Sequence, residues 1–528
     1  MTTGTIQNTE AGELGLHIAA RTVVGRCPAP LNAVEVAVVL ETCGYTTKRA
    51  RALGSDGLNA LAERVFALVP LYSSASSRQA LAPVALRSRP PGPLDLARGL
   101  AYSSPWLVSL ATLLIAGVSF WSSAVAIPPI ANAVTLATAI ALLVTGPFIQ
   151  AFGRRASFYI GMGDQGMLVR ITRWTLELGL VATVLSGVAL YLLRNDVLRA
   201  GTPATARLGL AAAISIAALQ LGLAAFYVRR AFLSIGIIVG GGAAVLVWFV
   251  SQSGPYTDPT ALIVGQIRLV AVMAAVCWVA SAWWLLRVDS SAPAALWRPS
   301  GSALLRAVAP YGLYGLAFFA IVIVPQLVSG GLLEARYTFN APFAMTSGVA
   351  IVVLVPLLAQ TVAATEHLLA RQFPAWLSRF TVAQTDDFRV EVRRYWREQL
   401  MVLGGLAVVS GAAVIVGAPR LGATFPILAD LARHPGLLAA CTVGYLCLGV
   451  GLFCSQLLFS LSAPMPPLVA AWAGLGALAA ASTGAAWAGP TVSAVAGLVA
   501  GAGVYACVAV VVANRAFTRA DLTYYRTL

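Results

Sequence analysis

Long apolar stretches separated by short polar segments fill the chain from residue 105 to residue 514. The first two, residues 105–123 and 131–152, are joined by a charge-free turn over residues 124–130 and followed by Arg154 and Arg155. A helix needs about 20 apolar residues to cross the hydrocarbon core of a bilayer. Because lipid offers backbone groups no hydrogen-bond partners, such a stretch must be helical. The pattern therefore predicts a hairpin of two membrane-spanning helices, which sets the membrane register of all that follows.

The same pattern predicts twelve spans in all. They cover residues 105–123, 131–152, 174–193, 207–228, 231–251, 261–286, 304–328, 341–363, 399–419, 437–462, 465–486 and 489–513. The polar segment 287–303 divides them into an N-lobe (residues 105–286) and a C-lobe (residues 304–514) of six spans each. The second span and the eighth both have a proline near the cytoplasmic end and charges just after it, which indicates two like halves of the kind found in transporters. The predicted fold class is an all-α polytopic membrane protein with two six-helix lobes.

The distribution of basic residues predicts the orientation in the membrane. With the N-terminus inside, the cytoplasmic segments hold 28 Lys and Arg residues and the opposite segments hold 6, while Arg268 is left inside a span. The positive-inside rule then places both termini in the cytoplasm. Residues 1–104 contain no long apolar run that could serve as a signal peptide. We expect a multi-pass protein of the bacterial inner membrane.

Residues 1–70 are expected to form a small helical domain on the cytoplasmic side. Asn32 is placed to cap a helix over residues 33–42, and Gly44 is placed to close it. Ser55 is placed to cap a second helix, whose apolar residues recur at helical spacing. These residues are Leu58, Leu61, Val65 and Leu68.

Polar segments flank and interrupt the spans. Residues 71–104 form a Ser/Pro-rich linker and the entry into the membrane, and residues 515–528 form a cytosolic tail. Segment 364–398 mixes charges with aromatic residues, which is typical of amphipathic helices at the membrane interface; docking of a partner is the alternative. The aromatic residues are Phe373, Trp376, Phe380 and Phe388. A basic cluster near the N-terminus is either a solvated face or a contact with anionic membrane lipid. Its members are Lys48, Arg49 and Arg51.

Composition agrees with a membrane protein. Hydrophobic residues make up 59% of the chain and charged residues 10%, whereas soluble domains carry about 25% charged residues. A net charge of +15 is typical of nucleic-acid binding, but the bases lie at the ends of spans, so no nucleic-acid partner is expected. The seven cysteines show no CxxC or Cys/His spacing. The sequence therefore predicts no metal site, no disulfide framework and no cofactor.

Charged and amide side chains inside the spans are candidates for a transport path, because such groups are costly in a membrane. Arg268 and Gln266 in the sixth span and Glu177 in the third could line a polar path between the lobes. The alternative is that Arg268 extends toward the outer interface and Glu177 lies at the inner one. Gln220 in the fourth span and Gln326 in the seventh offer hydrogen bonds without charge, which suits sugars.

The sequence does not indicate an enzyme. It contains no Walker motif and no Ser-His-Asp set in one region. The predicted first external loop, residues 124–130, carries no acid, whereas polyprenol-type membrane glycosyltransferases keep acidic residues there. Three consecutive glycines in the fifth span, residues 240–242, permit close helix packing or a hinge.

Three motifs, in the same order and at matching separations, resemble one family. SSPWLVSL (residues 103–110) resembles the opening of the first span in PelG-like transporters of Pel exopolysaccharide. LVTGPFIQAFGRRASFYIG resembles the exit of their second span. Residues 310–328, followed by residues 364–380, resemble their seventh span and the acidic and aromatic segment after their eighth. The matching positions are Ser104, Pro105, Trp106, Thr145, Gly146, Pro147, Arg154 and Glu366.

That family is part of the flippase superfamily of multidrug, oligosaccharidyl-lipid and polysaccharide exporters, which have two six-helix lobes. The resemblance implies export of a polysaccharide or a lipid-linked glycan, together with a cytosolic glycosyltransferase and other membrane subunits. Residues 1–95 have no counterpart in the family. A small-molecule antiporter of the same superfamily and a non-transporting scaffold of a polysaccharide synthase are the alternatives. We also expect the first and seventh spans to face a central cleft between the lobes.

Overall fold

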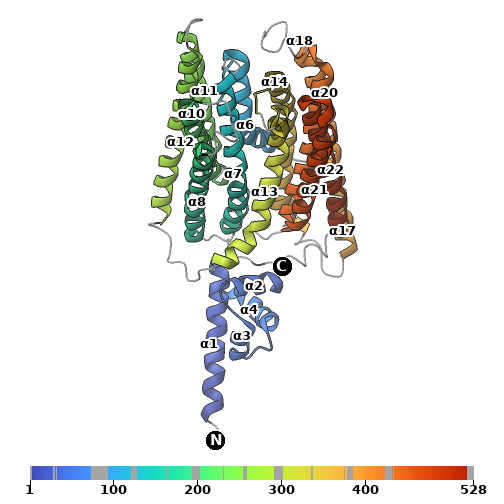
Figure 1. Cartoon of the computed structure of the whole chain (residues 1–528). Coiled ribbons are helices and arrows are strands. Elements are labelled where there is room, and N and C mark those ends of the chain that lie inside the picture. The colour runs from blue at the N-terminus through green and yellow to red at the C-terminus, as the bar shows by residue number, and fades with distance from the viewer. Residues whose placement is uncertain are drawn as a thin grey trace.

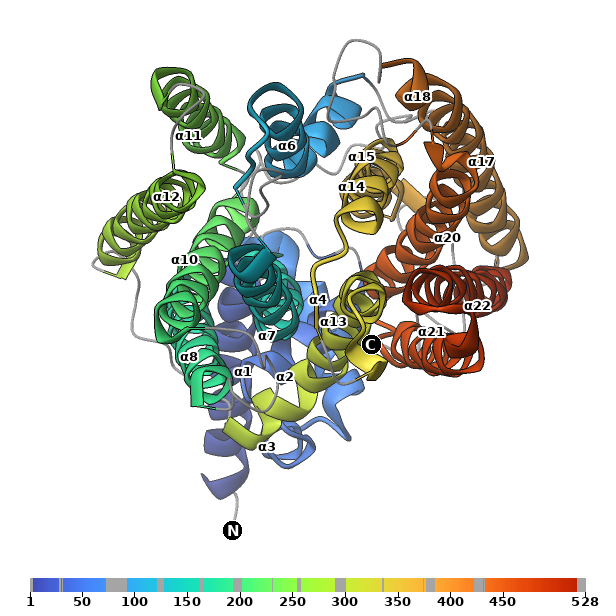
Figure 2. The ribbon, with the colours of Figure 1, turned by 45° about the horizontal axis from the view of Figure 1, so that its top comes forward.

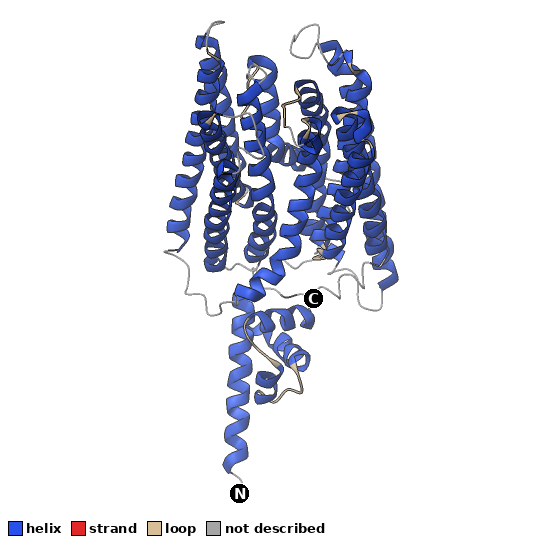
Figure 3. Ribbon diagram, in the orientation of Figure 1, coloured by secondary structure: helices blue, strands red, loops and turns tan. Residues whose placement is uncertain are grey.

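The chain is built from helices. The computed structural model describes residues 3–27, 30, 32–72, 93–120, 128–161, 165–192, 202–229, 231–253, 258–289, 301–334, 337–373, 375–376, 385–421, 431 and 433–519. Within these ranges the elements are helices joined by turns, and no β-strand is present (Figure 3).

Four helices form a small N-terminal domain at one end of the molecule (Figure 1). They are α1 (Thr3–Arg26), α2 (Ala33–Thr42), α3 (Thr47–Ala52) and α4 (Leu58–Tyr72). Asn32 caps α2, since its side chain accepts a hydrogen bond from the backbone N–H of Glu35 at 2.9 Å. Ser55 does not cap α4; its hydroxyl instead accepts a hydrogen bond from Arg64 at 3.2 Å. The four helices share a small buried apolar core of their own.

The remaining helices form two lobes that stand side by side (Figure 1). The N-lobe contains α6 (Pro93–Ala116), α7 (Pro128–Gly161), α8 (Gln165–Leu192), α10 (Pro203–Val228), α11 (Phe232–Ser253) and α12 (Pro259–Asp289). The C-lobe contains α13 (Gly301–Ser329), α14 (Ala341–Ala350) with α15 (Leu354–His367), α17 (Thr385–Ala412) with α18 (Ala418–Leu421), α20 (Pro435–Ser460), α21 (Met465–Gly484) and α22 (Pro490–Thr518). The predicted all-α fold with two six-helix lobes is confirmed.

Eleven of the described helical stretches are long and apolar enough to cross a membrane. The remaining long helix of the two lobes, α8, packs beside α7 and α10 in the same bundle. Its first half carries Arg170, Arg173 and Glu177, which shorten its apolar stretch. We call the end of the bundle where Arg154, Arg229 and Arg287 lie the basic end, and the opposite end the far end.

Two helix pairs join the lobes: α6 packs against α15, and α7 packs against α13 (Figure 2). Glycines allow the close approach. A Cβ atom at Gly99 would lie 2.3 Å from the carbonyl oxygen of Ala359, and one at Gly146 would lie 2.3 Å from the ring of Phe319. Both distances are far below van der Waals contact, so larger residues at these two positions would force the lobes apart.

Segment 364–398 differs from the predicted interfacial helices. Part of it extends α15 by a wider helical turn to Gln372, and α17 begins at Thr385. The ring of Trp376 is buried and lies edge-on to Phe388 and Tyr395, with centroids 6.1 and 5.9 Å away. These aromatic residues therefore belong to the C-lobe core, where their rings bury a large apolar area and pack edge-on. Phe380 lies outside the described residues.

Candidate functional site

A cavity of about 1490 Å³ lies between the two lobes. Helices α6, α7 and α10 line it from the N-lobe, and α13, α14, α15 and α20 line it from the C-lobe. The expectation that the first and seventh spans, α6 and α13, face a central cleft is confirmed. Pockets for drug-sized ligands measure about 300–1,000 Å³, so this cavity has room for a larger molecule.

Ionisable side chains in the cavity are confined to its ends. Among the described lining residues, the charged Arg154, Arg229 and Glu366 lie toward the basic end, and the imidazole of His434 lies at the far end. The guanidinium of Arg229 lies over the ring of Trp284, 4.4 Å from its centroid. Between the ends, the described lining is aliphatic, aromatic or neutral polar. The middle of the cavity thus suits an uncharged ligand.

The Ser104-Pro105-Trp106 motif shapes the wall that α6 contributes. Pro105 has no N–H, so the carbonyl of Ala101 loses its helical hydrogen bond. The hydroxyl of Ser104 donates to that carbonyl at 2.8 Å. The proline is therefore accommodated in a membrane helix with the backbone satisfied.

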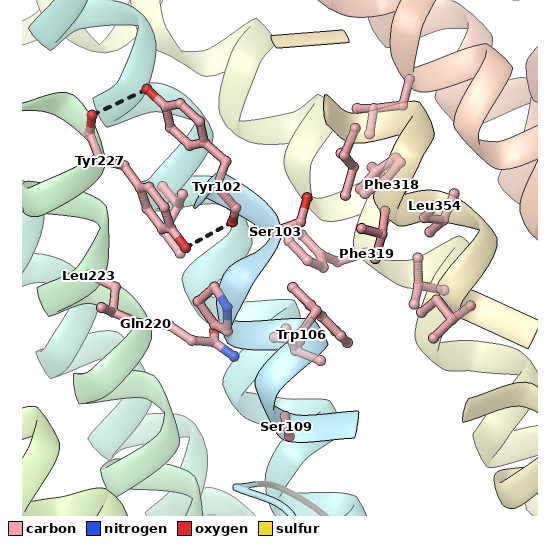
Figure 4. Close-up of a pocket in the computed structure, with 18 of the residues that line it drawn as sticks. Tyr102, Ser103, Trp106, Ser109, Gln220, Leu223, Tyr227, Phe318, Phe319 and Leu354 are labelled. Carbon is pink, nitrogen blue, oxygen red and sulfur yellow. Dashed lines mark hydrogen bonds between the residues drawn. The ribbon is translucent and has the colours of Figure 1, made fainter. Parts of the chain in front are cut away.

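Tyr102 and Tyr227 join α6 to α10 beside this motif (Figure 4). The Tyr227 hydroxyl donates to the carbonyl of Tyr102 at 3.0 Å, and the Tyr102 hydroxyl donates to the carbonyl of Tyr227 at 3.4 Å. Their rings stack, with centroids 5.1 Å apart and an interplanar angle of 16°. This reciprocal pair fixes α6 against the N-lobe.

Trp106 and Ser103 lie one turn apart on α6 and both line the cavity. Trp106 is 36% exposed and lies across the cavity from Phe319 and Leu354 of the C-lobe (Figure 4). Ser103 is fully buried, and its hydroxyl has no hydrogen-bond partner among the described residues. A buried polar atom without a hydrogen bond is costly. The Ser103 hydroxyl is therefore available to bind a ligand beside the ring of Trp106.

Gln220 provides a neutral polar group on the N-lobe wall. Its Oε1 lies 2.6 Å from the hydroxyl of Thr145, which lies 2.6 Å from the carbonyl of Ala141 as well. Thr145 has one hydroxyl proton to donate, and the two ends of a Gln amide are interchangeable by a flip. In either arrangement, Thr145 holds one amide atom of Gln220 and leaves the other to the cavity.

Gln326 lies on the C-lobe wall of the cavity. Its Nε2 donates to the hydroxyl of Ser347 at 3.2 Å, and that hydroxyl lies 2.6 Å from the hydroxyl of Tyr445. All three residues line the cavity, and they come from α13, α14 and α20. Oε1 of Gln326 makes no hydrogen bond within the described part of the chain, so it is left as an acceptor.

Polar contacts from α7 join the lobes at the far end. The side chain of Asn132 accepts a hydrogen bond from the N–H of Phe339 at 2.6 Å and donates to the carbonyl of Tyr337 at 3.4 Å. Burial raises the pKa of Tyr337 to about 12, against the weaker opposing effect of its hydrogen bond with Thr135. The phenol of Tyr337 is therefore neutral in this seam at physiological pH.

At the basic end, Arg154 of α7 makes the corresponding contact. It donates to the hydroxyl of Ser462 in the turn between α20 and α21, and it lies 5.8 Å from the ring centroid of Tyr311. Ser462 has a φ of 55° and is the one non-glycine among the described residues in the left-handed region. Thus α7 is tied to the C-lobe near both of its ends.

Three residues predicted for the path lie elsewhere. Arg268 is exposed on α12, outside the cavity lining, and its long side chain can extend from there toward the far-end interface. Glu177 is exposed on α8, where it pairs with Arg173 at 2.8 Å. Gln266 is buried inside the N-lobe, and its Oε1 has no hydrogen-bond partner among the described residues. Of the predicted path residues, the structure brings Gln220 and Gln326 to the cavity.

The positions named by the family resemblance gather at the cavity and at the seam between the lobes. Pro105, Trp106, Arg154 and Glu366 line the cavity. Thr145 orients Gln220. Gly146 and Pro147 both contact α13, where Gly146 lies against Phe319 and Pro147 lies beside Gly312.

Sequence reasoning missed Asn132, Ser347 and Tyr445. Asn132 follows a Pro-Pro pair at the start of a predicted span, and a polar residue there could have been taken as a signal. Ser347 and Tyr445 had no such signal, because hydroxyls are common inside membrane helices and pack without cost when they are paired.

No protein-family model and no curated protein sequence matches the chain. Solved structures do match. A point mutant of a MATE protein superposes with a TM-score of 0.57 at 17% identity, covering 81% of this chain and 96% of that one. A multidrug resistance MATE family transporter of the MOP superfamily, in an inward-facing conformation, gives 0.53 at 15% identity, covering 80% and 96%.

A MOP superfamily transporter from Pyrococcus furiosus, described as having a binding pocket of reversed polarity, gives a TM-score of 0.51 at 17% identity, covering 80% of this chain and 97% of that one. At these identities the likeness shows the fold: a multi-pass membrane protein with the architecture of MATE transporters of the MOP superfamily.

Proposed function

We propose that this protein exports a glycan, either a polysaccharide or a lipid-linked precursor, across the bacterial inner membrane. The observation that carries this proposal is the lining of the inter-lobe cavity. It is large, it is neutral in its middle, and each lobe presents a glutamine oriented by a hydroxyl, Gln220 by Thr145 and Gln326 by Ser347.

Sugars fit such a lining for two reasons. Their hydroxyls both donate and accept hydrogen bonds, so either end of an amide can bind them. Their ring faces carry C–H groups that pack against aromatic side chains such as Trp106. The arginines toward the basic end, Arg154 and Arg229, add affinity for an anionic group such as the phosphate of a lipid-linked sugar.

The orientation follows from the basic residues. Placing the basic end in the cytoplasm satisfies the positive-inside rule. Both termini and the N-terminal domain (α1 to α4) then face the cytoplasm, where a glycosyltransferase and other subunits of an export complex could dock. The contacts of the protein with its partners are part of the proposal and rest on the family resemblance.

Blocking the cavity tests the proposal. Gly348 lines the cavity and has no atom within 4 Å of a built Cβ, so Gly348→Trp would fill the space without displacing backbone. Gly476 is equally open but lies on the exposed face of α21, outside the cavity lining. In a deletion strain, the wild-type chain and Gly476→Trp should restore surface polysaccharide, while Gly348→Trp, at equal membrane level, should not.

Two outcomes contradict the proposal. If the deletion strain keeps its surface polysaccharide, the substrate is not a glycan. If Gly348→Trp restores export as well as Gly476→Trp does, the cavity is not the path. In that case a chain lacking residues 1–95 that fails to assemble with its partners would support a scaffold.

A small-molecule antiporter is the second candidate, because the cavity is rich in aromatic and aliphatic side chains and the fold is shared with a multidrug resistance transporter. The charge distribution disfavours cationic drugs, since Glu366 is the one acid among the described lining residues and it shares its end of the cavity with two arginines. Resistance to cationic dyes, gained on expression in an efflux-deficient host and lost in Gly348→Trp, would favour this candidate.

A further inference from the structure

We propose that Gln220 and Gln326 are two sugar subsites at different depths of one path, so that the protein selects glycans at least two or three units long. The inference rests on the proposed glycan function and adds chain-length selection to it. It depends on three observations: each glutamine is half-buried in the cavity wall, each has one amide atom held by a hydroxyl, and the two lie at different levels.

The holding hydroxyls are themselves fixed. Thr145 contacts the carbonyl of Ala141 at 2.6 Å, and Ser347 contacts the buried hydroxyl of Tyr445 at 2.6 Å. Each glutamine is therefore oriented before a ligand arrives. Orientation in advance lowers the entropic cost of binding. The remaining amide atom makes no hydrogen bond within the described part of the chain, so it is available to a ligand group that donates or accepts a hydrogen bond.

The difference in depth follows from the contact between Asn132 and Phe339. This hydrogen bond of 2.6 Å places the start of α7 level with the start of α14. At a helical rise of about 1.5 Å per residue, Thr145 lies ~20 Å below that level and Ser347 lies ~10 Å below it. The two subsites are then about 10 Å apart along the path.

A separation of this size exceeds one sugar ring and matches a short oligosaccharide. Trp106 lies on α6 and also lines the cavity (Figure 4), so its ring offers an apolar face to a sugar unit bound there. A monosaccharide can occupy one subsite at a time. An oligosaccharide can occupy both, and the second contact is then intramolecular and strengthens binding without a second loss of translational freedom.

The experiment measures binding as a function of ligand length. The full-length protein in lipid nanodiscs is titrated calorimetrically with neutral 1,4-linked oligosaccharides of glucose and of N-acetylglucosamine, from one to six units. For the wild type, we expect affinity to rise over the first three units and then to level off. Gln220→Leu and Gln326→Leu should each remove this rise, lowering trisaccharide affinity about three- to tenfold while changing monosaccharide affinity about twofold or less.

Gln266→Leu is the matched control, since Gln266 is a buried membrane glutamine outside the cavity lining. It should keep the wild-type dependence on length. Thr145→Val and Ser347→Ala leave the amides in place but release them, so they should weaken the rise without abolishing it. Elution as a single species and an unchanged melting midpoint would show that a variant is folded; Gln220→Asn and Gln326→Asn replace any leucine variant that fails this check.

The proposal is overturned if wild-type affinity does not depend on length, if no oligosaccharide of any length binds, or if Gln266→Leu alters the series as the cavity variants do. Failure of the glycan function gives a different result. If export is restored by the wild type and blocked by Gly348→Trp but binding is independent of length, the function stands and the two-subsite inference falls. If the deletion strain exports normally, the function itself falls.

Discussion

The two lobes are built differently although each has six membrane helices. The described C-lobe has one large buried core with paired polar groups: Tyr505 bonds both Tyr314 and Ser455, at 2.8 Å each. The described N-lobe has several smaller apolar clusters. It also contains buried polar atoms without a partner in the described residues, in Ser103, Gln266 and Ser281. In the C-lobe these buried polar groups therefore stabilise the core by bonding one another. In the N-lobe, Ser103, Gln266 and Ser281 keep hydrogen-bonding groups that are available to another partner.

Of the substitutions that compare the two lobes, replacing a glycine should have the largest effect on stability. A Cβ at Gly474 on α21 would lie 2.7 Å from the carbonyl oxygen of Gly501 on α22, so Gly474→Leu must push two C-lobe helices apart. We expect a loss of about 3 kcal/mol or more, seen as loss of the monodisperse peak in size-exclusion chromatography. Gly241 on α11 of the N-lobe is exposed and has nothing within 4 Å. Gly241→Leu should elute as the wild type does; its failure to do so would mean that α11 is packed.

Removing a hydroxyl from the C-lobe core should have the next largest effect. Tyr505→Phe leaves the hydroxyls of Tyr314 and Ser455 without their shared partner, in a site fully buried in the C-lobe. We expect a cost of about 2 kcal/mol and a lower thermal unfolding midpoint. Tyr311→Phe is the control, because the Tyr311 hydroxyl makes no hydrogen bond with described residues while its ring is also buried. Equal shifts of the unfolding midpoint in the two variants would show that the hydroxyl pairing does not stabilise the C-lobe core.

Sequence reasoning predicted the two lobes well and the cavity in part. Helix positions followed from apolar length: α13 (Gly301–Ser329) covers the span predicted at 304–328, and α20 (Pro435–Ser460) matches the span predicted at 437–462 to within two residues at each end. Which face of a helix meets the cavity was harder to predict. Arg268 and Gln266 are close in sequence, yet one is exposed and the other buried, because neighbouring residues on a helix point about 100° apart. Only tertiary packing decides which of these directions is the cavity.

Contacts between the lobes should have a smaller and more local effect. Asn132→Ala removes two hydrogen bonds from the N-lobe helix α7 to the C-lobe backbone at the far end, and Arg154→Ala removes the contact with Ser462 at the basic end. In a cysteine-free background, a cysteine introduced at Gly348 is labelled by a membrane-impermeant thiol reagent added from the far-end side. We expect Asn132→Ala to raise the labelling rate several-fold and Arg154→Ala to leave it unchanged or lower it. The same increase in both variants would indicate general loosening of the seam.

The smallest effect, and the closest comparison of the lobes, comes from one substitution made in both. Ser103 in the N-lobe and Ser455 in the C-lobe are both fully buried, but Ser455 bonds Tyr505 whereas the Ser103 hydroxyl has no partner among the described residues. Ser455→Ala should cost about 1 kcal/mol, because it leaves Tyr505 with one partner fewer. Ser103→Ala should cost nothing or stabilise slightly, because the group removed gains nothing from burial. The midpoint of thermal unfolding checks both variants, and a fall as large in Ser103→Ala as in Ser455→Ala would mean that this N-lobe hydroxyl is bonded after all.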